Sequence, residues 1–208
     1  MKENIIALHQ KNIAKGAEHL FLDKGFNLTS ISDISETSGY SRRTIYKYFE
    51  SKEEILYYLI IEGLDHLVQS IGDAIDSEQN FLKRYEAICA CMLFYYENYA
   101  ISAQSVNRFQ SNAPLNMTTS VERIFALGVK INEYLSIWIE QGKEEGILKE
   151  SLDVMPTVYI LSTNLNALFE LVTTKGTYLF ASLHMTKEQF LSYGYTMNLN
   201  SLLKEPTK

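Results

Sequence analysis

The sequence contains few residues that interrupt helices. Its 208 residues include 3 prolines and 10 glycines, which argues against a turn-rich β-sandwich, a collagen-like repeat or a disordered chain. No apolar run reaches the roughly 18 residues of a membrane-spanning helix. The first residues, Met1 to Asn4, lack the charged and then apolar layout of a signal peptide. We therefore expect a cytoplasmic globular protein that is long enough to bury a substantial core.

Cysteine is also scarce, and the two that occur, Cys89 and Cys91, are two residues apart. In a helix this spacing places the two thiols on nearly opposite sides, so they do not converge on one metal ion. A secreted disulfide framework needs more cysteines than this. We expect buried or partly buried thiols, and no metal or other cofactor.

Charge is unevenly distributed along the chain. The whole sequence has 19 basic and 25 acidic residues, a net charge of −6. Residues 1–52 hold eight basic and six acidic residues, a net of +2, which leaves −8 for the remainder. Four of the basic residues, Arg42, Arg43, Lys47 and Lys52, fall within eleven positions. A basic end on an acidic body suits a protein that touches a polyanion with one end only.

Helical periodicity runs through most of the sequence. Ile6, Ile13, Ala17, Leu20 and Phe21 recur at the spacing of one helix face. No segment shows the sustained polar–apolar alternation of a strand between turn signals. The sequence therefore predicts an all-α fold. A short helix is capped by Thr29 or Ser30 and interrupted by Gly39, and the other helices run over about 4–23, 42–48, 51–74, 80–99, 102–111, 118–145, 154–182 and 187–203.

The segment 29–52, TSISDISETSGYSRRTIYKYFESK, predicts a helix-turn-helix. Ile31 and Ile34 mark the inward face of its first helix, and Gly39 permits the sharp turn that follows. Ser41 is placed to cap the second helix. In this arrangement the second helix presents its N-terminal residues to the major groove of DNA.

A wider set of residues surrounds this segment in a recognisable order and spacing: Phe21, Gly25-Phe26, Thr29-Ser30, Ile34, Gly39, Ser41, Thr44-Ile45-Tyr46, Phe49, Ser51-Lys52-Glu53 and Leu56. Through these residues the chain resembles the TetR family of bacterial transcriptional regulators over roughly residues 5–60. Ser35 and Ser38 stand where that family usually has Ala, and Tyr40 stands where Val is common. The resemblance implies a three-helix DNA-binding head at 1–50, followed by a larger helical regulatory and dimerisation domain at 51–208.

The chemistry of the second helix suggests how DNA is held. Arg42 and Arg43 are each suited either to bridging O6 and N7 of guanine or to binding a phosphate. Lys47 is suited to the backbone or a base, and Lys52 to a phosphate beside a helix N-terminus. Tyr46 and Tyr48 have packing as their alternative role. The hydrogen-bonding residues suited to phosphates are Thr29, Ser30, Ser41, Thr44, Tyr46 and Tyr48.

For the body, the resemblance implies a homodimer formed mainly by the helices at 154–182 and 187–203, and an apolar cavity for a small-molecule effector. A two-fold dimer matches a near-palindromic site in double-stranded DNA. Arg108 and Arg123 either meet an anionic group of the effector or are surface charges. Aromatic residues that either line this cavity or form plain core are Tyr85, Phe94, Tyr95, Tyr99, Phe109, Phe125, Tyr134 and Trp138.

The sequence thus predicts a ligand-responsive DNA-binding repressor. An enzyme is disfavoured, because there is no Gly-rich phosphate loop, HExxH or GxSxG, and the four histidines are scattered. A DNA-binding protein whose body binds another protein, rather than a small molecule, is the second hypothesis. A closed apolar cavity would favour the sensor, and an exposed apolar patch would favour the protein partner.

Overall fold

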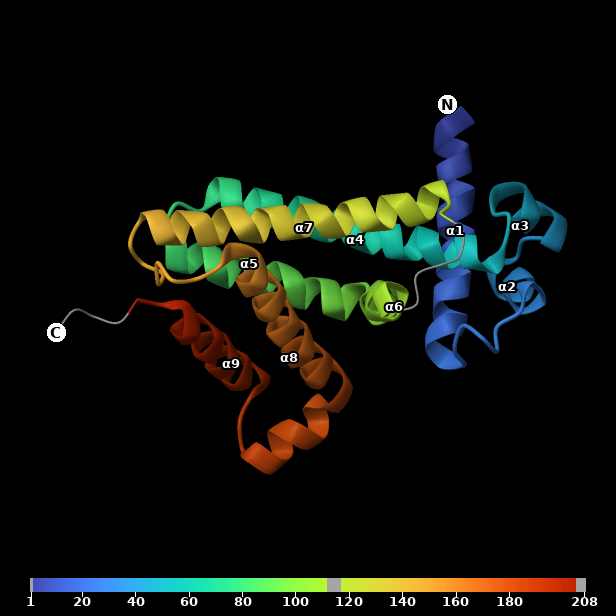
Figure 1. Ribbon diagram of the computed structural model, residues 1–208. Helices are drawn as coiled ribbons and strands as arrows, with labels where there is room; N and C mark the ends of the chain where they lie inside the picture. The colour runs from blue at the N-terminus through green and yellow to red at the C-terminus, as the bar shows by residue number, and fades with distance from the viewer. Residues whose placement is uncertain (1, 112–116, 205–208) are drawn as a thin grey trace. The chain divides into compact units, whose positions relative to one another are not determined.

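The structure, a computed structural model, describes residues 2–111 and 117–204, with side chains from 4 to 106 and from 117 to 204. Its described residues are almost entirely helical, which confirms the predicted fold class (Figure 1). The helices are α1 Lys2–Asp23, α2 Ile31–Ser38, α3 Arg42–Tyr48, α4 Lys52–Ser77, α5 Phe81–Asn98, α6 Ala100–Ser111, α7 Thr119–Glu144, α8 Val154–Leu183 and α9 Lys187–Leu202.

Local sequence signals account for most helix ends. Gly25, Gly39 and Gly146 have φ of 86°, 74° and 69°, a conformation that side chains with a Cβ rarely adopt. Ser41 caps α3, because its hydroxyl accepts a hydrogen bond from the Thr44 amide at 3.1 Å. One expectation fails on α1, where Ile6 is 44% exposed and takes no part in the core.

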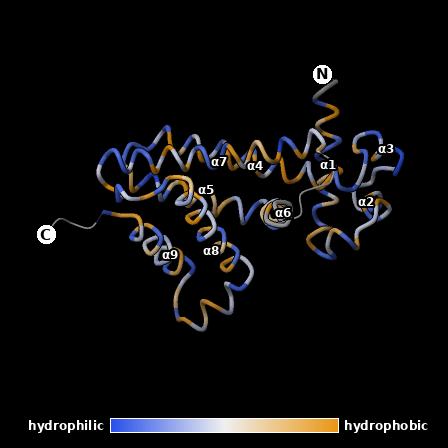
Figure 2. The backbone as a smooth tube through the Cα atoms, in the orientation of Figure 1, coloured by the Kyte–Doolittle hydropathy of each residue, from blue (hydrophilic) through white to orange (hydrophobic). Residues whose placement is uncertain are grey.

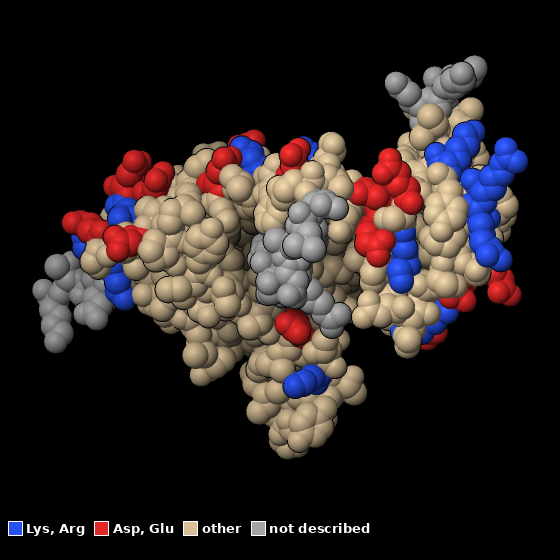
Figure 3. All heavy atoms as spheres, turned by 45° about the vertical axis from the view of Figure 1, so that its right-hand side comes forward, with Lys and Arg blue, Asp and Glu red and all other residues tan. Residues whose placement is uncertain are grey.

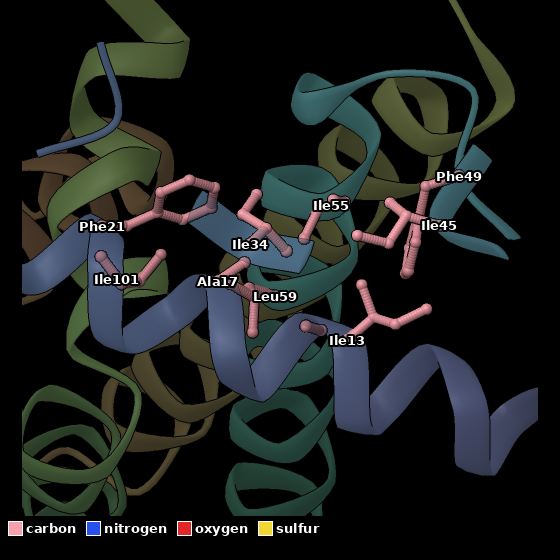
Figure 4. Packing of buried hydrophobic residues seen from close by; sticks show 10 residues of the cluster. Ile13, Ala17, Phe21, Ile34, Ile45, Phe49, Ile55, Leu59 and Ile101 are labelled. Atoms are coloured by element: carbon pink, nitrogen blue, oxygen red, sulfur yellow. The ribbon is translucent and has the colours of Figure 1, made fainter. Parts of the chain in front are cut away.

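Two compact units divide the described chain: Met1–His66 with Tyr99–Leu127, and Leu67–Asn98 with Gly128–Lys208. In the first unit, α2 and α3 lie on the same side of α1 (Figure 1). Figure 4 shows how buried side chains from these helices, α4 and α6 converge. The cluster consists of Ile13, Ala14, Ala17, Phe21, Ile34, Ile45, Phe49, Ile55, Leu59 and Ile101.

Helices α6 and α7 are tied into this first unit by polar contacts as well. The buried Ser102 hydroxyl of α6 donates to the Ile60 carbonyl of α4 at 3.0 Å. Glu54, in the first turn of α4, accepts hydrogen bonds from Thr118 and Ser120 at the start of α7. The first unit is therefore more than a three-helix head, because α6 contributes Ile101 to the same core.

The second unit is built around aromatic packing. The Trp138 ring of α7 stacks on Phe81 at 4.6 Å between centroids and on Tyr85 at 5.4 Å. The Tyr85 hydroxyl donates to the Tyr195 carbonyl of α9 at 3.2 Å. These contacts join α5, α7 and α9 through a dense interior.

Helices α8 and α9 pack closely within the second unit. A Cβ on Gly194 of α9 would lie 2.7 Å from Leu168 of α8, so the absence of a side chain there permits the approach. Figure 2 shows hydrophobic and hydrophilic residues interleaved along α8. Across the described ranges, no helix is long and apolar enough to cross a membrane.

Candidate nucleic-acid interface

Helix α3 has one buried side and one exposed side. Ile45 is fully buried in the core of the first unit. Arg42, Arg43, Tyr46 and Lys47 are all exposed. Their spacing places them in one stripe, because residues three and four apart are neighbours on a helix. We call these four residues the α3 face.

The three cations of the α3 face are exposed, and the Lys47 ammonium lies 5.6 Å from the centre of the Tyr48 ring. Among the described side chains, no ion pair involves Arg42, Arg43 or Lys47. Figure 3 shows Lys and Arg side chains gathered on one face of the first unit. Hydrophilic residues follow α3 in Figure 2. Clustered exposed cations that make no ion pairs form an electrostatic footprint for a polyanion.

The other predicted residues of this helix make contacts within the first unit. The Ser41 hydroxyl lies 2.8 Å from the Thr44 hydroxyl, and both belong to the N-terminal cap of α3. Tyr48 is half-buried, with its ring 5.2 Å from the imidazole of His9 on α1. Packing is therefore a role of Tyr48, whereas Tyr46 is 56% exposed.

The predicted phosphate contacts at the start of α2 are engaged inside the protein. Thr29 is 2% exposed, and its hydroxyl donates to the Gly25 carbonyl at 2.9 Å. The Ser30 hydroxyl donates to Asp33 at 2.7 Å. The Lys52 ammonium donates to the carbonyls of Phe26 and Thr29, each at 2.7 Å, and lies 4.2 Å from the centre of the Phe26 ring. Of these three, Lys52 alone retains a further donor, because an ammonium has three.

At the N-terminal end of α2, the Asp33 carboxylate accepts hydrogen bonds from Ser30 and forms an ion pair with Lys24. A hydrogen bond from Lys24, together with the backbone and hydroxyl of Ser30, holds the pKa of the Asp33 carboxyl well below its usual range. The Lys24–Asp33 ion pair measures 2.8 Å. Asp33 and Ser30 form a reciprocal capping box, which satisfies two otherwise unpaired donors of the helix end. The sequence signal for this capping box is a serine, Ser30, followed three residues later by an acidic residue, Asp33.

The predicted effector residues whose side chains are described are divided between the two compact units. Tyr99 and Phe125 belong to the first unit, and the others that are described belong to the second. Tyr85, Tyr95 and Trp138 are buried, whereas Phe94 is 45% exposed. The Tyr134 hydroxyl packs closely against Gly72, since a Cβ added to that glycine would lie only 2.8 Å from it. The side chain of Phe109 lies outside the described residues.

Residues of α8 in the second unit line a hollow. It has a volume of about 530 Å³, is open to solvent, and follows α8 from Val172 to Phe180. None of the predicted aromatic residues whose side chains are described lines it. Arg123 forms a 2.6 Å ion pair with Asp65 and is thus a surface charge, while the side chain of Arg108 lies outside the described residues.

The cysteines take the expected packing role. Cys89 is buried and Cys91 partly so, and both are free thiols. Burial raises the pKa of the Cys89 thiol to about 12, so the reactive thiolate is disfavoured. Within the ranges that carry side chains, no three His, Cys, Asp or Glu residues are grouped to hold a metal ion.

Residues 13–59 match the family model for bacterial regulatory proteins of the tetR family. An uncharacterised HTH-type transcriptional regulator, YfiR of Bacillus subtilis, is 36% identical over 69 residues, which are 33% of this chain and 34% of that protein. The HTH-type transcriptional repressor KstR2 of Mycobacterium tuberculosis is 28% identical over 141 residues, 66% of this chain and 68% of the relative. The chain thus spans about a third of the first relative and about two thirds of the second.

Solved structures share the fold along most of the chain. The ketosteroid transcriptional regulator KstR2 of Mycobacterium tuberculosis superposes with a TM-score of 0.64 at 20% identity, covering 94% of this chain and 95% of that one. AibR, solved in complex with isovaleryl coenzyme A and operator DNA, gives a TM-score of 0.72 at 15% identity, covering 91% and 97%. At these identities the likeness concerns the fold alone.

Proposed function

Because the chain belongs to the TetR family of transcriptional regulators, we propose that it is a repressor that binds a near-palindromic DNA site as a homodimer. A small apolar or aromatic effector releases it. The observation that carries this proposal is the α3 face, where three exposed cations, without ion-pair partners among the described side chains, stand on the side of the helix opposite its buried Ile45. Such a rod fits the major groove of duplex DNA.

Within this proposal, Arg42 and Arg43 read bases or hold phosphates, and Lys47 joins them from the next turn. Tyr46 contacts the duplex with its exposed ring and hydroxyl. The supporting residues are Ser41, Thr44, Tyr48, Thr29 and Ser30, whose polar groups or rings already have partners inside the first unit. Lys52 has one donor left for a phosphate.

A homodimer is supported by apolar residues on the outside of α8 and α9. Tyr159 is 58% exposed, Ile160 63% and Tyr178 79% on α8. On α9, Tyr193 is 62% exposed and Met197 59%. Large exposed apolar side chains that recur on adjacent helices mark an interaction surface, and a second copy offers the same surface in return. A different protein bound at this surface is the second candidate function.

The chemistry of the effector is suggested by the relatives. One is named for fatty acid metabolism and is 28% identical over 152 residues, and the AibR structure contains isovaleryl coenzyme A. We therefore propose an effector with an apolar acyl or polycyclic part, with acyl-coenzyme A thioesters as the first compounds to test. Release follows only if the effector binds the DNA-free conformation more tightly than the DNA-bound one.

Selection of duplexes from a random pool by the purified protein tests the proposal. We expect enrichment of a near-palindromic sequence, bound with an affinity that falls steeply as salt rises. Light scattering at micromolar concentration is expected to report a dimer. A monomer would favour the protein-partner function for α8 and α9, and a pool without enrichment would refute sequence-specific binding.

Effector release is tested with the selected duplex. Fluorescence anisotropy is measured while isovaleryl-, longer acyl- and free coenzyme A are added separately. Release by an acyl thioester, but not by free coenzyme A, is the expected result. Equal release by all three would indicate competition from the negatively charged nucleotide part.

A further inference from the structure

We propose that His9 is a positioning residue for DNA recognition, because its imidazole holds both ends of α3 against α1. This inference rests on the proposed function and adds to it a residue outside the helix-turn-helix. Nothing in its position in the sequence indicates the role, since His9 precedes α3 by more than thirty residues.

The geometry places His9 between two tyrosines. Its Nδ1 lies 2.9 Å from the Tyr40 hydroxyl, and the two rings meet edge to face at 5.5 Å between centroids. On the other side its ring lies 5.2 Å from that of Tyr48. Tyr40 immediately precedes Ser41, the cap of α3, and Tyr48 is the last residue of the helix. One side chain of α1 therefore contacts the residues at both ends of α3.

Neighbouring residues of α1 strengthen this contact. The Asn12 amide donates to the Tyr40 hydroxyl oxygen at 3.4 Å, which leaves the phenolic hydrogen free to be donated to His9 Nδ1. The Gln10 amide donates to the Tyr48 carbonyl, also at 3.4 Å. From α2, the Ser35 hydroxyl donates to the Tyr40 carbonyl at 2.7 Å. The turn before α3 and the end of α3 are thus both fixed by directional bonds.

Such anchoring matters because α3 has only seven residues. A helix this short is not stable alone and takes its orientation from its surroundings. Ile45 and Phe49 attach it to the core, but apolar burial has little directionality and leaves the rotation of the helix about its axis loosely defined. Hydrogen bonding and ring contacts at the two ends define that rotation, and with it the direction in which Arg42 and Arg43 point.

The His9 imidazole and the Tyr40 hydroxyl lie within hydrogen-bonding distance of each other across 31 residues of sequence. Each of these two side chains therefore helps to position α3 only while its partner is present. A pair of this kind has a testable signature, because removing either partner should have the same effect as removing both.

The first test measures hydrogen exchange of backbone amides in the free protein. The variants are His9→Phe, which keeps a ring beside Tyr48, Tyr40→Phe, which removes one oxygen, and the double variant. We expect the amides of residues 45–48 to exchange about fivefold faster than in the wild type in each single variant, which is the effect of losing one hydrogen bond. In the double variant these amides should exchange no faster than in either single variant. His19→Phe, at an exposed imidazole on the same helix, is the matched control and should leave exchange unchanged.

The second test compares DNA affinity on two duplexes, one selected by the wild type and one unrelated. Each single variant should bind the selected duplex about fivefold more weakly than the wild type, and the double variant should bind it no more weakly than a single variant. The affinity for the unrelated duplex should be unchanged. Additive losses, or equal losses on both duplexes, would overturn the positioning role. If the wild type binds no duplex, the proposed function fails, while unchanged exchange in residues 45–48 would separately overturn the role of His9.

Discussion

The α3 face and the N-terminal end of α2 carry similar polar side chains and use them in opposite ways. Arg42, Arg43 and Lys47 point outward without ion-pair partners among the described side chains. At the α2 end, by contrast, Ser30 and Lys52 donate to groups of the protein itself. The comparison shows that residue type alone does not mark a binding residue. A donor is available to DNA only where the fold has not already given it an acceptor.

The largest expected effect is the difference in stability loss between substitutions on the buried and the exposed side of α3. Ile45→Ala removes a fully buried side chain and should lower the free energy of unfolding by about 2–5 kcal/mol. Tyr46→Ala, one position along at an exposed site, should change it by less than about 0.5 kcal/mol. Urea unfolding measures both. Similar losses would mean that the exposed side of α3 is also part of the core.

Arg42→Ala and Arg43→Ala should act on DNA binding and leave stability unchanged. A lost base contact weakens binding of a selected duplex by about 1–3 kcal/mol, whereas a lost phosphate contact weakens all duplexes alike. Fluorescence anisotropy at fixed salt distinguishes the two roles. The matched control is Arg123→Ala, an exposed arginine paired with Asp65 on α4. Wild-type affinity in both α3 variants would remove them from the interface.

Lys52→Gln tests a residue to which we assign two roles, one in holding the α2 end and one in binding a DNA phosphate. Loss of two carbonyl contacts should lower the free energy of unfolding by about 1–2 kcal/mol. If the third donor binds a phosphate, the dependence of log affinity on log salt should flatten by about one unit. Reduced stability with an unchanged salt slope would assign Lys52 to the α2 end alone.

The smallest effect concerns Asp33 and pH. Because the pKa of Asp33 is lowered in the folded protein, the unfolded chain binds its proton first as the pH falls. The stabilisation from Asp33 is therefore complete above the ordinary aspartate pKa of about 4 and is lost progressively below it. Asp33→Asn should flatten the dependence of stability on pH in this acid range. A variant that keeps the wild-type slope would show that other carboxyl groups are responsible.

Much of the fold could be predicted because helix ends depend on neighbours in the sequence. Gly25 and Gly39 do adopt positive φ, and Ser41 does cap α3. The helix bounds agree with the structure within a few residues, since periodicity and caps are local signals. The exposed residues of α3 follow from the same periodicity once Ile45 is assigned to the core.

Partners far apart in the sequence could not be predicted in this way. Lys52 bonds to carbonyls 23 and 26 residues earlier, and His9 meets Tyr40 across 31 residues. A helical pattern identifies which face is buried, but not which atoms lie against it. The same limit applies to Tyr85 and Trp138, whose rings stack on each other, because the sequence does not distinguish such packing from the lining of a ligand pocket.

The most direct test of the account compares two exposed tyrosines, Tyr46 on α3 and Tyr178 on α8. Each is replaced in turn by a photo-crosslinking phenylalanine derivative, and the protein is irradiated with a labelled selected duplex. We predict that position 46 crosslinks to the DNA, whereas position 178 crosslinks to a second copy of the chain and not to DNA. Crosslinking of DNA at position 178 but not at position 46 would contradict the assignment of the α3 face as the DNA-binding surface.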